Sequence, residues 1–244
     1  MDLLHPIPKT YVAEIAWGAE TDNGDPLGTV TAKGDAARLT PGLLERALAT
    51  FVGFRDQVPP RTSNKRVGGE RAYRRAHRGE SFELPPSRVY LHEATWLSHR
   101  LPQSSTVQLV TGGGYYVRSL ARDLGRETGA LAHLRALRRT AIGPWGDPPP
   151  LQSVRVHGED LFPWCASVHV DAEEARALRA GKGIRSREPE PPRWALPPGF
   201  PDPQAPVRAL HDGELIAMLR PRDGMLVPDP PPRRRSERRG RTQR

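Results

Sequence analysis

The sequence predicts a protein of the α/β (α+β) class, with a mixed, mainly antiparallel sheet, flanking helices and a small β-rich domain after it. Apolar residues alternate in residues 11–17, as in a strand, and recur at helical spacing in residues 43–51. Residues 144–150, rich in proline and glycine, indicate a linker. A chain of 244 residues is long enough for one main domain and one accessory domain.

The first third of the chain predicts a strand, a turn and a helix. The strand, residues 11–17, breaks at the turn signal Asn23-Gly24-Asp25-Pro26. Thr40 and Pro41 provide the N-cap and the first-turn proline of the helix, and Gly53 ends it. Its core face consists of Leu43, Leu44, Ala47, Leu48 and Phe51.

The middle of the chain predicts a loop, two strands and three helices. Residues 59–64 have the composition of a loop, and residues 69–77 that of a short basic helix. Residues 88–97 and 106–110 are rich in Val, Tyr, Thr and Leu, which favours strands. Two further helices are predicted on either side of Gly129, over residues 116–128 and 130–139.

The linker signal places the main domain at residues 1–147 and the second at 148–228, followed by a disordered basic tail at 229–244. In the second domain, Asp171 and Glu174 form a capping box, and Gly181 ends the helix that follows. Two more elements are predicted there, a proline-rich loop over residues 189–206 and a hairpin over residues 209–217 that turns at Asp212-Gly213.

The positive charge is segregated along the chain. The formal net charge is +9, and residues 233–244 hold seven Arg against one Glu. Residues 61–78 hold seven basic side chains against one Glu. A basic surface that is local in sequence suits a phosphate backbone, whereas scattered solvated charge gives little field. Only four of the 37 basic residues are Lys, a bias that phosphate recognition or high genomic GC content would explain equally well.

Several functional classes are disfavoured. The single cysteine, Cys165, excludes an internal disulfide framework and a cysteine-cluster zinc site. The eight His have no metal-ligand spacing, and Gly112-Gly113-Gly114 is not followed by the Gly-Lys-Ser/Thr of a P-loop. These patterns disfavour a metal site and a P-loop nucleotide site. No apolar run is long enough to cross a membrane and no apolar signal region begins the chain, so a cytoplasmic location is expected.

Four motifs occur in a characteristic order: Lys9-Thr10-Tyr11, then Thr21-Asp22-Asn23-Gly24-Asp25, then Gln57-Val58-Pro59-Pro60, and finally a segment from Gly114 to Thr140. The last contains Gly114-Tyr115-Tyr116-Val117-Arg118-Ser119-Leu120 and ends in Leu137-Arg138-Arg139-Thr140. Together these motifs resemble the bacterial tRNA pseudouridine-55 synthases of the TruB type. The resemblance covers roughly residues 9–217, and residues 211–217 resemble an RNA-binding domain of the PUA kind.

The resemblance implies an enzyme with the pseudouridine synthase fold that isomerises uridine 55 in the T arm of tRNA by flipping the base, without a metal or redox cofactor and without an obligate protein partner. It assigns Tyr11 to stacking on the uracil and Arg118 to pairing with the catalytic carboxylate. It assigns further substrate contacts to Tyr116, Leu137, Lys65 and Tyr73. Taken singly, Tyr11 and Leu137 would be core residues and Arg118 a solvated helix residue.

The sequence departs from the family pattern in two places, the first of which concerns the expected activity and the second local RNA contacts. The family aspartate lies in a loop reading like G-T-L-D-P, some thirty residues before the Lys-x-Tyr strand, and only ten residues precede Tyr11 here. Asp25 follows Tyr11 and is explained by turn chemistry. Thr111-Gly112-Gly113 replaces a Cys-Ser-Lys-like run. Because the aspartate loop is missing, we expect this sequence as written to be inactive. The alternatives to an enzyme are a catalytically inactive RNA-binding protein and a truncated gene product that lacks a stable fold.

Overall fold

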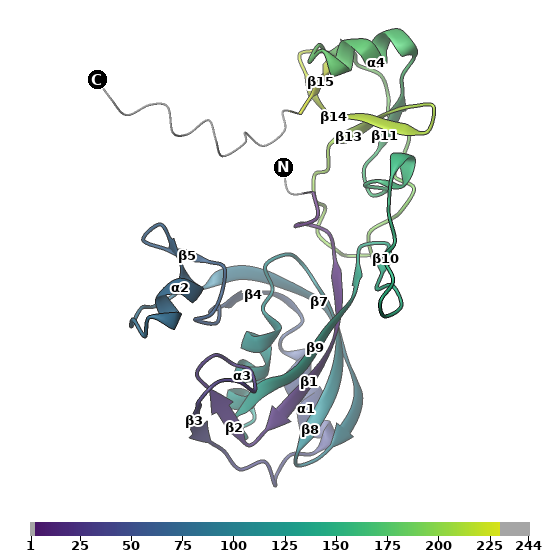
Figure 1. Ribbon diagram of the computed structural model, residues 1–244. Helices are drawn as coiled ribbons and strands as arrows, with labels where there is room; N and C mark the ends of the chain where they lie inside the picture. Colours follow the sequence, from purple (N-terminus) through teal and green to yellow (C-terminus); the bar gives the residue numbers. More distant parts are fainter. Residues whose placement is uncertain (1–2, 230–244) are drawn as a thin grey trace, which may run out of the picture. The chain divides into compact units, whose positions relative to one another are not determined.

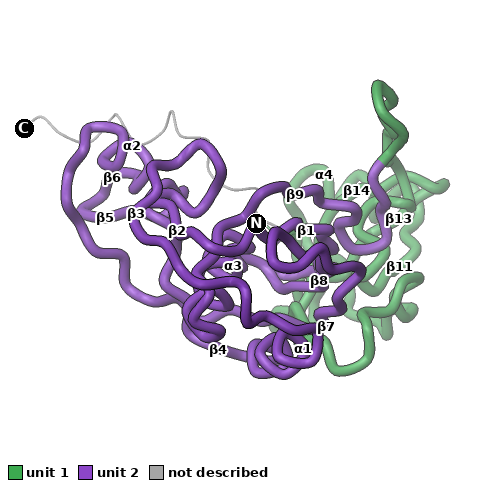
Figure 2. Tube along the Cα trace, turned by 90° about the horizontal axis from the view of Figure 1, so that it is seen from below, with its two compact units in different colours: residues 1–4, 148–244 green, residues 5–147 purple. Residues whose placement is uncertain are grey.

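The computed structural model describes residues 3–229, which form two compact units, residues 5–147 and a second that comprises residues 148–229 with the first described residues (Figure 2). The predicted tail, apart from Asp229, lies outside the described residues. No helix in the described part of the chain has the length and apolar character needed to cross a membrane.

The unit of residues 5–147 is built on a six-stranded sheet in the order β10-β9-β1-β8-β7-β4 (Figure 1). All of its strand pairs are antiparallel. The six strands are β1 (Lys9–Trp17), β4 (Gly53–Gln57), β7 (Ser87–Arg100), β8 (Ser104–Thr111), β9 (Ala132–Ile142) and β10 (Trp145–Gly146). The fold class predicted from the sequence is therefore confirmed.

Two helices pack into one apolar core with the sheet. Helix α1 (Pro41–Ala49) begins as predicted, since Thr40 accepts a hydrogen bond from the backbone N–H of Leu43 and Pro41 occupies the first turn. Helix α3 (Val117–Glu127) lies against β9. The alternating residues of β1 face this core, where Ala13 and Ile15 are fully buried.

The prediction of a helix over residues 130–139 was wrong, because this segment is strand β9. Two residues with positive φ, Gly129 at 70° and Leu131 at 53°, separate β9 from α3. The strand then pairs with β1 over its whole length. The spacing of its apolar residues is compatible with a helix or a strand. Pairing with β1, more than a hundred residues earlier in the chain, stabilises the strand.

Smaller elements project from this sheet. Strands β2 (Ala19–Thr21) and β3 (Val30–Lys33) form a hairpin, as do β5 (Arg66–Val67) and β6 (Glu70–Arg71). Helix α2 (Ala72–His77) is shorter than the helix predicted over residues 69–77, because Glu70 and Arg71 belong to β6.

The second unit has a five-stranded sheet in the order β11-β13-β14-β15-β12. The capping box of Asp171 and Glu174 and the turn at Asp212-Gly213 are both present as predicted. The elements are the 3₁₀ helix η1 (Gly158–Asp160), β11 (Ser167–His169), α4 (Ala172–Arg179), β12 (Ile184–Arg185), β13 (Val207–His211), β14 (Glu214–Arg222) and β15 (Met225–Pro228).

Cys165 is fully buried in this unit. Burial raises the pKa of its thiol to about 11, and only the thiolate is nucleophilic. We expect iodoacetamide at pH 8 to label Cys165 far more slowly in the folded protein than in guanidinium, as followed by mass spectrometry. Because the pKa is raised on folding, the associated stability is present below pH 9 and is lost as the pH approaches 11. Equal labelling rates in the two solvents would contradict this.

Candidate functional site

The start of α3 is fixed to the end of β4 by Gln57. Its Oε1 accepts a hydrogen bond from the backbone N–H of Tyr116 at 2.9 Å, and its Nε2 donates to the Tyr116 carbonyl at 3.1 Å. Gln57 is 2% exposed, and Tyr116 is the N-cap of α3 without a side-chain cap of its own. The Gln57 amide therefore takes the place of a capping side chain and sets the position of the residue that follows.

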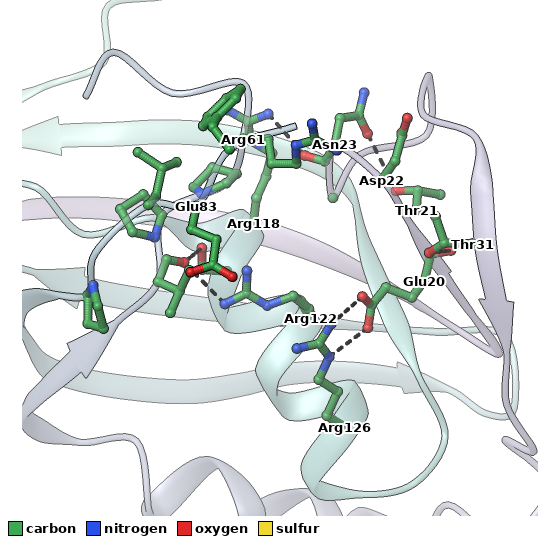
Figure 3. Close-up of a pocket in the computed structure, with 18 residues that line it drawn as sticks. Glu20, Thr21, Asp22, Asn23, Thr31, Arg61, Glu83, Arg118, Arg122 and Arg126 are labelled. Carbon is green, nitrogen blue, oxygen red and sulfur yellow. Dashed lines mark hydrogen bonds and ion pairs between the residues drawn. The ribbon is translucent and has the colours of Figure 1, made fainter. Parts of the chain in front are cut away.

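Arg118 lies two residues into this fixed segment, on α3 (Figure 3), and its hydrogen bonds join two loops to the helix. Its Nη1 donates to the Asn23 carbonyl at 3.1 Å and to Thr62 Oγ1 at 2.6 Å, and its Nη2 donates to the Thr62 carbonyl at 3.2 Å. The turn that contains Asn23 and the loop that contains Thr62 thus meet at one guanidinium.

Gly24 lets the turn of residues 21–28 approach both α3 and β9. Its φ is 75°, and a Cβ at this position would lie 3.3 Å from Cβ of Arg118. Its carbonyl accepts a hydrogen bond from the backbone N–H of Leu134 on β9 at 3.0 Å. A side chain here would be strained in conformation and would press on Arg118.

Asp25, in the same turn, is the carboxylate that forms an ion pair with Arg118, with Oδ2 3.6 Å from Nη1. Its Oδ1 accepts from the Leu27 N–H at 3.0 Å and from Asn23 Nδ2 at 2.9 Å, as expected of a turn residue. The side chain is 30% exposed. The turn chemistry was predicted from the sequence, but the contact with Arg118 was not.

A cleft of about 690 Å³ opens beside Arg118 (Figure 3). Its lining includes Arg118, Arg122 and Arg126 of α3 and the acidic residues Glu20, Asp22 and Glu83. The apolar part of the lining consists of Val58, Pro59, Pro60, Phe82, Leu84 and Pro86. Two of the arginines are already engaged, since Arg122 donates to the Val58 carbonyl at 3.1 Å and Arg126 forms two hydrogen bonds with Glu20.

The other predicted site residues lie outside the residues that line this cleft. Tyr11, on β1, packs against the main core, and Tyr116 is the N-cap of α3. Leu137, on β9, is 47% exposed and lies opposite Ala13. The cleft itself therefore brings Arg118 together with turn and loop residues, but not with Tyr11, Tyr116 or Leu137.

Lys65 and Tyr73 belong to the small substructure of β5, β6 and α2. The Lys65 carbonyl accepts from the Ala72 N–H at 2.7 Å, and the Tyr73 N–H donates to the Ser63 carbonyl at 3.1 Å. These bonds place the two residues in one substructure, which is joined to Arg118 through Thr62.

The basic segment of residues 61–78 is partly neutralised. Arg78 forms ion pairs with Glu70 and Glu80, both at 2.7 Å, and Arg75 pairs with Glu80 at 2.6 Å. These hydrogen bonds hold the pKa of the Glu80 carboxyl below its ordinary value. Glu80 lies two residues beyond this segment and compensates part of its positive charge.

No group of three His, Cys, Asp or Glu side chains among residues 3–229 is arranged to hold a metal ion. The site places the Arg118 guanidinium beside the Asp25 carboxylate, next to a cleft lined by basic, acidic and apolar side chains.

Comparison with known proteins gives a consistent result. Residues 1–117 match the family described as "TruB family pseudouridylate synthase (N terminal domain)". The tRNA pseudouridine synthase B of Caulobacter vibrioides is 32% identical over 236 residues, which cover 90% of this chain and 74% of that protein. The enzyme of the same name from Bradyrhizobium diazoefficiens is 35% identical over 219 residues, with 88% of this chain and 58% of that protein covered.

Solved structures agree on the fold. A chain of an H/ACA RNP bound to a substrate RNA containing 2'-deoxyuridine has a TM-score of 0.57 at 14% identity, covering 93% of this chain and 66% of that one. A Cbf5-Nop10-Gar1 complex gives a TM-score of 0.57 at 17% identity with the same coverage. The chain spans little more than half the length of several curated relatives that it matches. From its sequence and its fold, the chain belongs to the TruB family of pseudouridine synthases.

Proposed function

We propose that this protein binds the T arm of tRNA and isomerises uridine 55 to pseudouridine. The observation that carries the proposal is the meeting of two separate loops and helix α3 at the Arg118 guanidinium. The reaction breaks the bond between C1′ and N1 of uridine, rotates the base and rejoins it through C5. Substrate and product are isomers, so no electrons are gained or lost and no redox cofactor is needed.

The role of Arg118 in this reaction is to hold a carboxylate in its charged form beside the ribose. A cation within a few ångströms favours the ionised form of a carboxyl group and fixes its direction. Asp25 Oδ2 lies 3.6 Å from Arg118, which makes Asp25 the residue to test for this position.

The flipped uracil would be held by Tyr11 and Leu137, with Tyr116, Lys65 and Tyr73 as further contacts. Base flipping requires aromatic and apolar walls that replace the stacking lost from the RNA. The basic side chains of residues 61–78 that lack a carboxylate partner would contact the RNA backbone. The unit after residue 147 would add RNA contacts in the manner of a PUA domain, and we infer no obligate protein partner and a cytoplasmic location.

A second candidate function is RNA binding without chemistry. The geometry of Asp25 favours it, because one carboxylate oxygen is occupied by two turn hydrogen bonds and the other lies 3.6 Å from Arg118. An aspartate that is built into a turn in this way is constrained as a nucleophile.

One experiment separates the two functions. The purified protein is mixed with a T-arm stem-loop RNA that carries tritium at C5 of uridine 55. Isomerisation replaces the C5–H bond, so the proposed function predicts tritium release, and Arg118→Gln should reduce the release by at least about 100-fold. Binding that weakens steeply with salt but releases no tritium would select the second candidate.

Asp25→Ala shows which carboxylate reacts. Loss of release in this variant, with RNA affinity unchanged, would assign the reaction to Asp25, whereas full release would place the reacting carboxylate elsewhere. If the wild-type protein does not bind the T-arm RNA, both functions are wrong.

A further inference from the structure

Strand β9 carries three exposed arginines, and two of them are neutralised by carboxylates. Arg135 Nη1 lies 3.4 Å from Glu14 Oε1, and Arg138 Nε lies 2.6 Å from Asp147 Oδ2. The Arg139 side chain, in contrast, has no hydrogen bond or ion pair with any residue in the described part of the chain. Among the arginines of β9, Arg139 is therefore the one available to an external anion.

The strand register places Arg139 beside the predicted uridine contacts. In the antiparallel pairing of β1 with β9, Arg139 lies opposite Tyr11, and Leu137 lies opposite Ala13. Directly opposite residues point to the same face of a sheet, with Cβ atoms about 5 Å apart. The guanidinium of Arg139 thus shares a face with the Tyr11 ring and the Leu137 side chain, and Arg138, opposite Val12, lies on the other face.

A break in the register marks this place. The pairing shifts between Thr10 and Tyr11, so that β9 has Thr140 as an extra residue after Arg139. The Thr140 hydroxyl donates to the Thr10 carbonyl at 3.4 Å. Bulges of this kind bend a strand and redirect side chains, and they are frequent next to functional sites.

We propose that Arg139 binds a phosphate of the nucleotide whose base stacks on Tyr11, an inference that rests on the proposed function. An aromatic ring, an exposed leucine and an unpaired guanidinium on one face match the base and the phosphate of a single nucleotide. Arginine suits this task because its planar fork can bind two phosphate oxygens. Arg139 then fixes the register of the RNA, while Tyr11 holds the base.

The test compares Arg139→Gln with Arg138→Gln, a matched control one residue away on the opposite face. Binding of an unmodified T-arm stem-loop RNA is measured from 50 to 300 mM KCl. Arg139→Gln should lower affinity about tenfold and reduce the slope of log affinity against log salt by about 0.7, the value for one phosphate of a single strand. Arg138→Gln should leave the slope unchanged.

A second probe locates the contact. Two RNAs each carry one uncharged methylphosphonate, on the 5′ or the 3′ side of the target uridine. Wild type and Arg138→Gln should lose affinity for one of them, whereas Arg139→Gln should bind that RNA and the unmodified RNA equally. Arg139→Lys, which keeps the charge, should restore part of the difference. Thermal melting of each variant verifies that it is folded.

The inference and the proposed function fail in different ways. If wild type does not bind the T-arm RNA, the proposed function is wrong and the inference falls with it. If wild type binds but Arg139→Gln retains the methylphosphonate penalty, the inference is overturned and the function stands. Equal losses in the Arg139 and Arg138 variants would also overturn it, because they would indicate a general field rather than a contact.

Discussion

Arg118→Ala is expected to lower the free energy of unfolding of the unit of residues 5–147 by about 3 kcal/mol, because hydrogen bonds to charged groups contribute about 1.5 to 3 kcal/mol each. The change removes the bonds that join α3 to Asn23 and Thr62. The Arg118 side chain is 24% exposed, so water screens these bonds only in part. Urea denaturation measures the loss.

Hydrogen exchange shows whether the loss is local. In Arg118→Ala, amides of residues 21–28 and 57–64 should exchange faster, while those of β8 should not. Arg46→Ala is the control, since Arg46 is exposed on α1, and it should change stability by less than about 0.5 kcal/mol. Unchanged exchange in both loops would show that Arg118 does not hold them.

Gly125→Ala is expected to destabilise the same unit by about 3 kcal/mol, the upper end of the usual cost of overpacking. Gly125 is buried in α3, and a Cβ there would lie 2.2 Å from the backbone nitrogen of Ala132. The helix would have to move away from β9, and backbone atoms cannot give way as a flexible side chain can. The expected change in stability is opposite to the usual effect of this substitution, since alanine normally stabilises a helix interior by about 1 kcal/mol relative to glycine.

Gly42→Ala is the matched control for this change. Gly42 is also helical, in α1, but a Cβ there would come no nearer than 3.6 Å to the end of the Arg46 side chain. This variant should be slightly more stable than wild type. Denaturation curves that move in the same direction for both glycines would contradict the close approach of α3 and β9.

Local signals in the sequence predicted local structure correctly. Thr40, Asp171 and the Asp212-Gly213 turn each satisfy nearby backbone groups, so a few neighbouring residues determine the outcome. The segment of residues 130–139 was assigned wrongly because its partner, β1, is distant in sequence. Apolar spacing alone does not distinguish a helix from a strand that pairs with such a partner.

The order of the motifs indicated the family, but not which atoms of the motif segments contact each other. At the level of sequence, the turn accounted for the presence of Asp25. Its contact with Arg118 could not be predicted, because that contact depends on how residues 21–28 fold against α3. Gln57 is hydrogen-bonded to the backbone of Tyr116, 59 residues away in sequence. No local sequence pattern predicts this contact, although Gln57 belongs to one of the motifs. The assignments of Tyr11, Tyr116, Leu137, Lys65 and Tyr73, and the expected inactivity of the printed sequence, stay predictions.

The position of Gly24 also limits how the length of the chain can vary. Its carbonyl accepts a hydrogen bond from β9, and a Cβ at this position would lie 3.3 Å from Cβ of Arg118, so an insertion or deletion in this turn would shift both neighbours. The tip of the hairpin at Gly68-Gly69 is different, because open space surrounds both glycines. Extra residues can be accommodated there without disturbing α3 or the sheet.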